Sequence, residues 1–288
     1  MDARAAFAGA RVGVIGTGAM AEAMVAGMLE THVVDPGQLC CSHPREERRR
    51  QLAERFGVST AASNQAAAEG ADVVLLAVKP QVLPTVMPEL RTVLTDDQLV
   101  VSVIAGASTR ALGDGLGHPA IVRSMPNTPA QIGQGVTVWY ATGAVTPPQK
   151  ERTRTMLSAL GREFEVHDEG QVAMATAVSG TGPTYIFLFI EALVDAAVHL
   201  GFPRHVARDL VLDTMQGSAA FALRSGRHVA ELRDMVTSPG GTSAEALYEL
   251  ERGRLRTVVS DAVWAAYERT RQLEGRLEGR DDGQRKRR

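Results

Sequence analysis

The segment Gly13–Ala21 reads Gly-Val-Ile-Gly-Thr-Gly-Ala-Met-Ala and continues a short β-branched run. A strand, a Gly-x-Gly-x-x-Ala turn and a helix in this order bring the pyrophosphate of a dinucleotide onto backbone N–H groups. Gly16 permits the tight turn, Gly18 lets the phosphate approach, and the small Ala21 lets helix and strand pack closely. The pattern predicts a dinucleotide site. Its predicted residues are Gly16, Gly18, Ala19 and Met20.

The end of the next predicted strand distinguishes NAD from NADP. An NAD site usually carries an acidic residue there, about 20 residues beyond the glycines, to bind the ribose hydroxyls. This chain has Cys-Ser-His-Pro-Arg at positions 41–45, and its first carboxylate is Glu46. Ser42 and Arg45, with Arg48, offer donors to a 2′-phosphate that a carboxylate would repel. NADPH is therefore favoured over NADH, against the alternative that these arginines only form a solvated helix face.

Two further motifs follow predicted strands at the carboxyl edge of the sheet, where ligands bind in such folds. An Ala-Val-Lys-Pro motif ends one strand, and the ammonium group of Lys79 could orient cofactor or substrate. In the second motif, Met-Pro-Asn-Thr-Pro, two prolines stiffen a loop that could frame a nicotinamide. A lysine at a strand end and a rigid turn without a ligand are the alternatives. The predicted cofactor-binding residues are Ala77, Val78, Lys79, Pro80, Met125 and Asn127.

Two glycine- and hydroxyl-rich segments precede predicted helices in the second half of the chain, at positions 179–183 and 237–245. Thr242 and Glu245 fit a capping box, which predicts that a helix begins near residue 243. Unhindered amides and the helix dipole would form a site for a substrate carboxylate, whereas helix capping alone is the simpler alternative. The predicted substrate-binding residues are Ser179, Thr181, Gly182, Ser238, Gly240, Gly241, Thr242 and Ser243.

A parallel sheet would position these motifs. Short apolar runs alternate with amphipathic segments through the first half, which predicts an α/β fold with a Rossmann-type doubly wound sheet. The predicted strands are Arg11–Ile15, Gln38–Ser42, Asp72–Val78, Leu99–Ala105, Ala120–Ser124, Gly135–Ala141 and Glu163–His167. The predicted helices between them are Met20–Leu29, Arg45–Phe56, Gln81–Leu94 and Pro147–Leu160.

After Asp168 the pattern is almost entirely helical. The predicted helices are 170–178, 183–200, 203–224, 228–236 and 242–274, the last broken near Gly253. Several are apolar on more than one face and need more than one neighbour, so a second subunit and a homodimer are expected. The predicted domains are an NADP-binding domain at 1–168, an all-α substrate-binding and dimerisation domain at 169–275, and a charged, disordered tail at 276–288.

Composition excludes several classes of function. The chain is 44% hydrophobic and 22% charged, as in a globular protein, and its net charge of −2 argues against general nucleic-acid binding. The adjacent Cys40 and Cys41 form no disulfide or metal-binding pattern. Glu191 and Asp195 interrupt the most apolar helix, so no membrane span is expected. Because the N-terminus also lacks a signal pattern, a cytoplasmic protein is expected.

Taken together, the motifs resemble the pyrroline-5-carboxylate reductase family over about residues 11 to 274. The segment LRDMVTSPGGTSAEALYELE at 232–251 is similar to that family's signature loop and helix, and AVKP, RSMPNTP and SGTGPTY stand in the expected order. Four separated motifs are far more specific than any one of them. The chain departs from the family's usual residues at Ala19 (often Asn), Thr181 (Ser) and Ser243 (Thr).

The resemblance implies a helical domain that interlocks with its mate in a homodimer, and in some members a homodecamer of five dimers. It implies hydride transfer from NADPH to the C=N bond of 1-pyrroline-5-carboxylate, giving L-proline in the last step of proline biosynthesis. The substrate carboxylate would lie on Ser238–Ser243 and the nicotinamide near Lys79 and the Met125–Thr128 loop. Ser243, which could hydrogen-bond the ring nitrogen, and Lys79 are the predicted catalytic residues.

Three alternatives stay open from the sequence. A reductase for another cyclic imino acid would use the same loops. A non-catalytic NADP-binding protein would need only the cofactor site, whereas this chain carries loops for a substrate as well. A 3-hydroxyacid dehydrogenase has a similar two-domain plan but would use a lysine early in its second domain, and this chain has none between Lys150 and Lys286.

Overall fold

A computed structural model describes residues 3–279 and divides them into two compact units. The sheet unit contains the residues up to Gly182 together with the chain from Ala266 onward. The helical unit contains Pro183–Ala265. The compact units therefore divide the segment 169–275, because its first helix and the end of its last helix pack with the sheet.

The sheet unit is built on one eight-stranded sheet with the order β3-β2-β1-β4-β5-β6-β7-β8. The strands are β1 (Val12–Ile15), β2 (Leu39–Ser42), β3 (Ser59–Ala61), β4 (Val73–Leu76), β5 (Leu99–Ser102), β6 (Ile121–Met125), β7 (Gly135–Ala141) and β8 (Gly161–Glu165). All neighbouring strands are parallel except β6 and β7. The strand order reverses between β1 and β4, which is where such sheets bind dinucleotides. The predicted Rossmann-type fold is confirmed.

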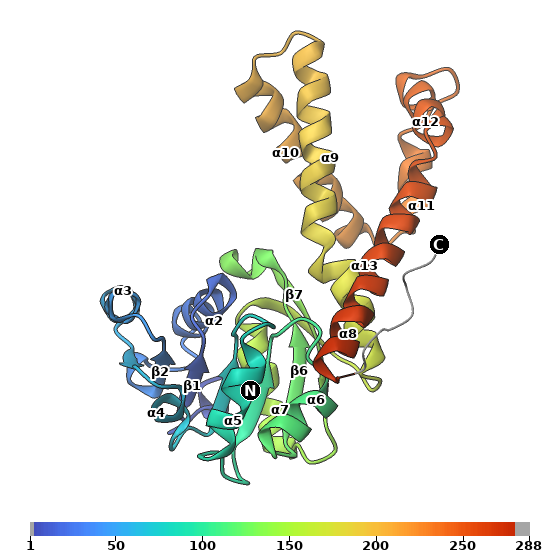
Figure 1. The fold of residues 1–288 in the computed structure, drawn as a ribbon. Helices are drawn as coiled ribbons and strands as arrows, with labels where there is room; N and C mark the ends of the chain where they lie inside the picture. Colours follow the sequence, from blue (N-terminus) through green and yellow to red (C-terminus); the bar gives the residue numbers. More distant parts are fainter. Residues whose placement is uncertain (1–2, 280–288) are drawn as a thin grey trace. The chain divides into compact units, whose positions relative to one another are not determined.

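Helices cover both faces of this sheet (Figure 1). They are α1 (Ala3–Ala6), α2 (Ala19–Glu30), α3 (Glu46–Phe56), α4 (Asn64–Ala68), α5 (Leu83–Arg91), α6 (Thr109–Leu116), α7 (Pro147–Ser158) and α8 (Gly170–Ala175). Successive strand residues face opposite sides. Val73 and Leu75 therefore pack in a core with α2 and α7, while Val74 and Leu76 pack in a second core with α5 and α6. Burial on both faces explains why these strands are continuous apolar runs.

The sequence pattern does not predict β3, α4 or α6. β3 has three residues and α4 has five, too few to show a period. The sequence of α6 contains Gly113 and Gly115, which disfavour a helix interior, but its buried Leu112 and Leu116 anchor it on the second core. The predicted strands that run to Val78 and Ala105 end earlier, at Leu76 and Ser102, because the chain turns there into loops at the carboxyl edge of the sheet.

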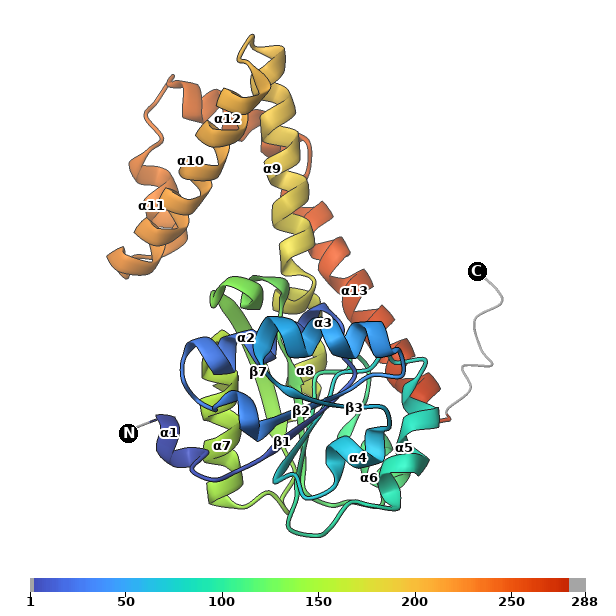
Figure 2. The same ribbon diagram turned by 90° about the vertical axis from the view of Figure 1, so that its left-hand side faces the viewer.

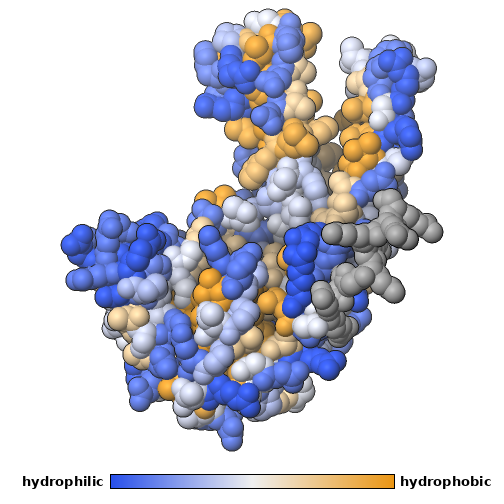
Figure 3. Space-filling model, viewed as in Figure 1, coloured by the Kyte–Doolittle hydropathy of each residue, from blue (hydrophilic) through white to orange (hydrophobic). Residues whose placement is uncertain are grey.

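The helical unit contains α9 (Gly182–His199), α10 (Arg204–Ser225), α11 (Val229–Met235), α12 (Thr242–Arg252) and the beginning of α13 (Leu255–Leu277). Among its residues, only Val194 and Ala207 are buried. Large apolar side chains are exposed along its helices (Figure 3), among them Ile186, Phe187, Leu188, Phe189, Leu193, Phe221 and Trp264. Monomeric proteins rarely expose so much contiguous apolar surface, so this unit needs a covering partner.

The helices bear on two expectations from the sequence, the absence of a membrane span and the start of the tail. The continuous helical stretch Gly170–His199 is long and apolar enough to cross a membrane by length and composition alone, even with Glu191 and Asp195. α13 continues to Leu277, two residues into the predicted tail. The rest of that tail, 280–288, lies outside the described residues.

Candidate cofactor and substrate site

The glycine turn between β1 and α2 leaves the start of the helix uncapped and open. Gly18 is the N-cap of α2, and no side chain caps the helix. The first N–H groups of the helix, those of Ala19 and Met20, therefore donate to no capping side chain. Gly16 has a φ of 89°, and a Cβ atom there would lie 2.8 Å from Val78 Cγ1 and 2.9 Å from the Ala77 carbonyl oxygen. At Gly18 no atom lies within 4 Å of such a Cβ. This open, uncapped helix start fits a pyrophosphate.

The turn therefore packs directly against Ala77 and Val78, the two residues that follow β4. Lys79 follows them as an exposed residue, and its carbonyl oxygen accepts a hydrogen bond from the Val82 N–H at 2.9 Å, which turns the chain after Pro80 into α5. Lys79 thus stands three residues beyond the carboxyl end of β4, as the glycine turn stands beyond the end of the neighbouring β1.

The residues predicted to bind a 2′-phosphate differ in what they offer. The Ser42 hydroxyl is buried and donates to Asn64 Oδ1 at 2.8 Å. The Arg48 guanidinium pairs with Glu22 and donates to the Thr17 carbonyl oxygen at 3.1 Å. Arg45, the N-cap of α3, is exposed, and within residues 3–279 its side chain has no ion pair. Of the three, Arg45 is thus the one whose charge stays available to a phosphate.

Asn64 is a residue that the sequence analysis misses. It lies at the start of α4, 22 residues after Ser42, and its Nδ2 donates to Glu89 Oε2 at 2.8 Å. No local pattern marks it, because only the parallel pairing of β2 with β3 brings the two segments together. Asn64 places a carboxamide beside the end of β2, where the adenosine ribose of a dinucleotide lies in such folds.

Titratable groups at the end of β2 are held neutral. Burial raises the pKa of the Cys41 thiol to about 12 and raises the pKa of Cys40 as well. Burial lowers the pKa of His43, whose Nδ1 accepts the Arg45 backbone N–H at 3.1 Å. A protonated thiol is a poor nucleophile, so this end of the site binds rather than reacts.

The predicted nicotinamide loop is held from two sides by one side chain. Asn127 is buried; its Oδ1 accepts the Val136 N–H at 2.8 Å, and its Nδ2 donates to the Ser179 carbonyl oxygen at 3.1 Å. The loop then continues as a 3₁₀ helix at Thr128–Ile132 rather than as an irregular turn. The carboxamide of Asn127 therefore fixes the loop against β7 and the segment that follows α8.

The segment around Ser179 is a π-helical turn, not the predicted loop. It spans Thr176–Gly180 and joins α8 to α9, with Thr181 N–H and Thr181 Oγ1 both donating to the Thr176 carbonyl oxygen at 2.8 Å. The Ser179 hydroxyl donates to the Ala175 carbonyl oxygen at 3.1 Å. Both hydroxyl hydrogens are thus used inside the helix, and the oxygen lone pairs are left to accept. Such turns are frequent at functional sites and have no sequence signature.

This π-helical turn packs on the nicotinamide loop. A Cβ atom at Gly180 would lie 2.9 Å from Met125 Cε, so the glycine permits the close approach. Together with the Asn127–Ser179 hydrogen bond, this contact brings the predicted cofactor residues Met125 and Asn127 next to the predicted substrate residues Ser179 and Thr181. Gly182 begins α9, and Pro183 occupies its first turn, as predicted.

The remaining predicted substrate residues lie in the helical unit, at the start of α12. The predicted capping box is wrong: Gly241 is the N-cap, Thr242 is already helical, and no side chain caps the helix. Gly240 has a φ of 68°, and the Gly241 N–H donates to the Ser238 carbonyl oxygen at 3.0 Å. The N–H groups of Thr242 and Ser243 are therefore at an uncapped helix start, which fits a carboxylate.

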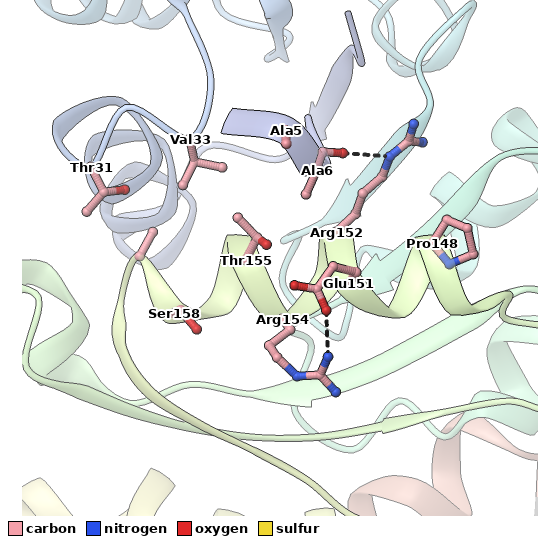
Figure 4. Close-up of a pocket in the computed structure, with 11 residues that line it drawn as sticks. Ala5, Ala6, Thr31, Val33, Pro148, Glu151, Arg152, Arg154, Thr155 and Ser158 are labelled. Atoms are coloured by element: carbon pink, nitrogen blue, oxygen red, sulfur yellow. Dashed lines mark hydrogen bonds and ion pairs between the residues drawn. The ribbon is translucent and has the colours of Figure 1, made fainter. Parts of the chain in front are cut away.

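A hollow of about 680 Å³ lies elsewhere, on α7 and the turn after α2 (Figure 4). Its arginines are engaged, since Arg152 donates to the Ala6 carbonyl oxygen at 3.1 Å and Arg154 pairs with Glu151 at 2.7 Å. None of the predicted site residues lines it. We assign no ligand to it.

Comparisons with known proteins match this arrangement. Residues 169–273 match the family model described as pyrroline-5-carboxylate reductase dimerisation, and residues 11–106 match the model described as NADP oxidoreductase, coenzyme F420-dependent. Pyrroline-5-carboxylate reductase from Pseudomonas aeruginosa is 40% identical over 93% of this chain and 98% of its own length. The corresponding protein from Synechocystis sp. is 39% identical over 91% of this chain and 98% of its own length.

Solved structures give the same result. A pyrroline-5-carboxylate reductase from Coxiella burnetii has a TM-score of 0.85 and 37% identity, covering 92% of this chain and 98% of its own. The Plasmodium falciparum pyrroline carboxylate reductase with NADP bound has a TM-score of 0.85 and 30% identity, with the same two coverages. Because a named member is 40% identical over 93% of this chain, and the dimerisation model matches residues 169–273, the chain belongs to the pyrroline-5-carboxylate reductase family.

Proposed function

We propose that this chain reduces 1-pyrroline-5-carboxylate to L-proline with NADPH, as the last step of proline biosynthesis in the cytoplasm. The observation that carries the proposal is the pair of uncapped helix starts, one at Gly18 for a pyrophosphate and one at Gly241 for a carboxylate. The identity of 36–40% to named reductases over most of the chain supports the same substrate.

The chemistry asks the protein mainly to position two reactants. NADPH supplies the hydride that the imine carbon accepts. The amides of Thr242 and Ser243 hold the substrate carboxylate, and the Ser243 hydroxyl hydrogen-bonds the ring nitrogen. Lys79 and the loop at Met125–Asn127 orient the nicotinamide end of the cofactor. Holding two reactants in line is worth several orders of magnitude in rate, so no strongly acidic or basic side chain is required when the imine is already protonated.

The direct test follows NADPH absorbance with 1-pyrroline-5-carboxylate as acceptor, with NADH and a six-membered cyclic imino acid in parallel. Turnover that favours NADPH and the five-membered ring is expected. Turnover only with the larger ring would make the chain a reductase of another imino acid. NADPH binding without turnover of either substrate would make it a non-catalytic NADP-binding protein.

Self-association is part of the proposal. The exposed apolar helices of α9 to α13 are proposed to interlock with those of a second copy, and five such dimers to form a decamer. The matched dimerisation model over 169–273 supports the homodimer. Sedimentation in the absence of detergent is expected to give a dimer or a decamer, and recovery of the protein only with membranes would contradict this assignment of α9.

Replacing Ser243 with alanine is expected to lower kcat about 10- to 100-fold, because one hydrogen bond to a charged group contributes roughly 1.5–3 kcal/mol. Ser243→Thr keeps the hydroxyl and should retain activity within about threefold, a change of less than 1 kcal/mol. Steady-state kinetics with saturating NADPH measure both variants. An unchanged kcat in Ser243→Ala would remove the hydroxyl from the mechanism.

Replacing Arg45 with alanine is expected to raise the KM for NADPH about tenfold and leave that for NADH unchanged, since an exposed guanidinium–phosphate contact contributes about 1.4 kcal/mol. Arg50→Ala is the matched control, because Arg50 is an exposed arginine of the same helix that pairs with Glu54. Equal effects of Arg45→Ala on both cofactors would contradict a contact with the 2′-phosphate.

A further inference from the structure

Arg123 is a buried charge that the proposed reaction does not use. It lies on β6, two residues before the nicotinamide loop, and is 3% exposed. Its Nη1 donates to Glu169 Oε1 at 3.0 Å and its Nη2 to Glu274 Oε1 at 2.5 Å. Glu169 is the N-cap of α8, and Glu274 belongs to the last turns of α13. One guanidinium therefore holds two helices that are 105 residues apart in the chain.

These two helices are the points where the chain leaves the sheet unit and returns to it. The chain passes from α8 through the π-helical turn to Gly182, where the sheet unit ends, and the sheet unit resumes at Ala266 within α13. The intervening segment carries the candidate carboxylate loop Ser238–Ser243. The chain thus enters the segment that carries this loop after α8 and leaves it through α13, and Arg123 binds both helices.

Other contacts also hold the start of α8 and the end of α13 on the sheet unit. Glu169 accepts hydrogen bonds from the Thr109 N–H at 2.7 Å and from Thr109 Oγ1 at 2.6 Å. Ser108 Oγ donates to Glu278 Oε1 at 2.6 Å. The last turns of α13 pack beside α5 and α6 (Figure 2), where a Cβ atom at Gly106 would lie 2.8 Å from Leu273 Cβ. The end of α13 is therefore held on the sheet unit by close packing as well as by charge.

The loop after β6 also holds the π-helical turn that follows α8. Asn127, four residues after Arg123, donates to the Ser179 carbonyl oxygen in the π-helical turn. β6 thus binds the N-cap of α8, and the loop after β6 binds the π-helical turn that follows α8, so these elements form one hydrogen-bonded group.

Stability alone does not explain why an arginine stands at position 123. Replacing a buried ion pair by apolar side chains is often neutral or stabilising, whereas a bidentate guanidinium fixes the direction of two partners. Lysine carries the same charge but lacks the planar fork that reaches two carboxylates on separate nitrogens. An arginine at this place is therefore suited to setting geometry.

We propose that Arg123 is a positioning residue for hydride transfer, and this inference rests on the proposed reduction of a cyclic imino acid. Without touching cofactor or substrate, Arg123 fixes the nicotinamide loop, the start of α8 and the end of α13 in one arrangement. The productive alignment of the nicotinamide, and with it the rate of hydride transfer, depends on that arrangement.

The test is a single-turnover reaction with the dimeric or decameric enzyme in excess over NADPH and with saturating 1-pyrroline-5-carboxylate. Arg123→Lys is expected to lower the rate constant of NADPH oxidation about 100-fold, since a 1 Å misalignment has an effect of that order. The number of NADPH-binding sites per chain and the Kd for NADPH, both from fluorescence titration, should stay unchanged. Arg154→Lys is the matched control, because Arg154 also binds several carboxylates but lies on α7 against β8.

The number of NADPH-binding sites per chain separates positioning from folding. Fewer sites per chain with an unchanged rate constant would mean fewer folded molecules, and it would overturn the proposal, as would no change in either quantity. If Arg123→Lys does not fold, Glu274→Gln decides by the same two readouts. Glutamine keeps the shape of the Glu274 side chain and removes one of the two negative charges that pair with Arg123. A wild-type enzyme without turnover would instead contradict the proposed function.

Discussion

Replacing Gly16 with alanine is expected to lower the affinity for NADPH at least about 100-fold and to destabilise the sheet unit by about 2–4 kcal/mol. The added methyl would lie 2.8 Å from Val78 Cγ1 and 2.9 Å from the Ala77 carbonyl oxygen, and the φ of 89° disfavours any side chain. The turn would have to move away from β4 and take the start of α2 with it. Fluorescence titration with NADPH and thermal unfolding measure the two effects.

The matched control is Gly18→Ala, two residues later in the same turn. No protein atom lies within 4 Å of a Cβ at Gly18, so the fold should keep its stability. NADPH affinity should nevertheless fall, because the methyl would occupy the space that the phosphate needs. A remote glycine with similar open space, Gly143, provides the baseline. Unchanged binding in Gly18→Ala would mean that the pyrophosphate does not lie on this turn.

The sheet could be predicted because its chemistry is local. Buried parallel strands are short apolar runs whatever their partners, and the glycine turn is a pattern of nine residues. β3 and α4 have no such pattern, so the sequence predicts neither of these elements, nor Asn64, which lies in α4. Their positions follow from pairing with β2, which joins residues about 20 apart.

Hydrogen-bond partners were predictable only in part. The cluster Arg45–Arg50 indicates phosphate binding, but the sequence does not tell which arginine is engaged elsewhere. Arg48 pairs with Glu22, 26 residues earlier, because α2 and α3 lie side by side on the sheet. The π-helical turn at Thr176–Gly180 and the N-cap at Gly241 depend on local backbone hydrogen bonds, which residue types do not specify.

Gly241 offers the sharpest test of the carboxylate site. Gly241→Ala is expected to raise the KM for the imino acid about 100-fold, through about 2.7 kcal/mol of lost binding, with the Kd for NADPH unchanged. The new methyl would lie 2.5 Å from Ser238 Oγ and 3.1 Å from the Ser238 carbonyl oxygen, so the loop must open and the amides of Thr242 and Ser243 must turn away from the carboxylate.

The cause can be separated from a general loss of structure by adding Ser238→Ala. That change removes the oxygen at 2.5 Å and leaves the carbonyl oxygen at 3.1 Å, so the double variant should recover part of the lost affinity. The four KM values, for the parent, the two single variants and the double variant, form a cycle in which a clash appears as a favourable coupling of about 1 kcal/mol. Additive effects would mean that the glycine is needed for another reason, such as direct approach of the substrate to its Cα, which would still place the carboxylate at this helix start.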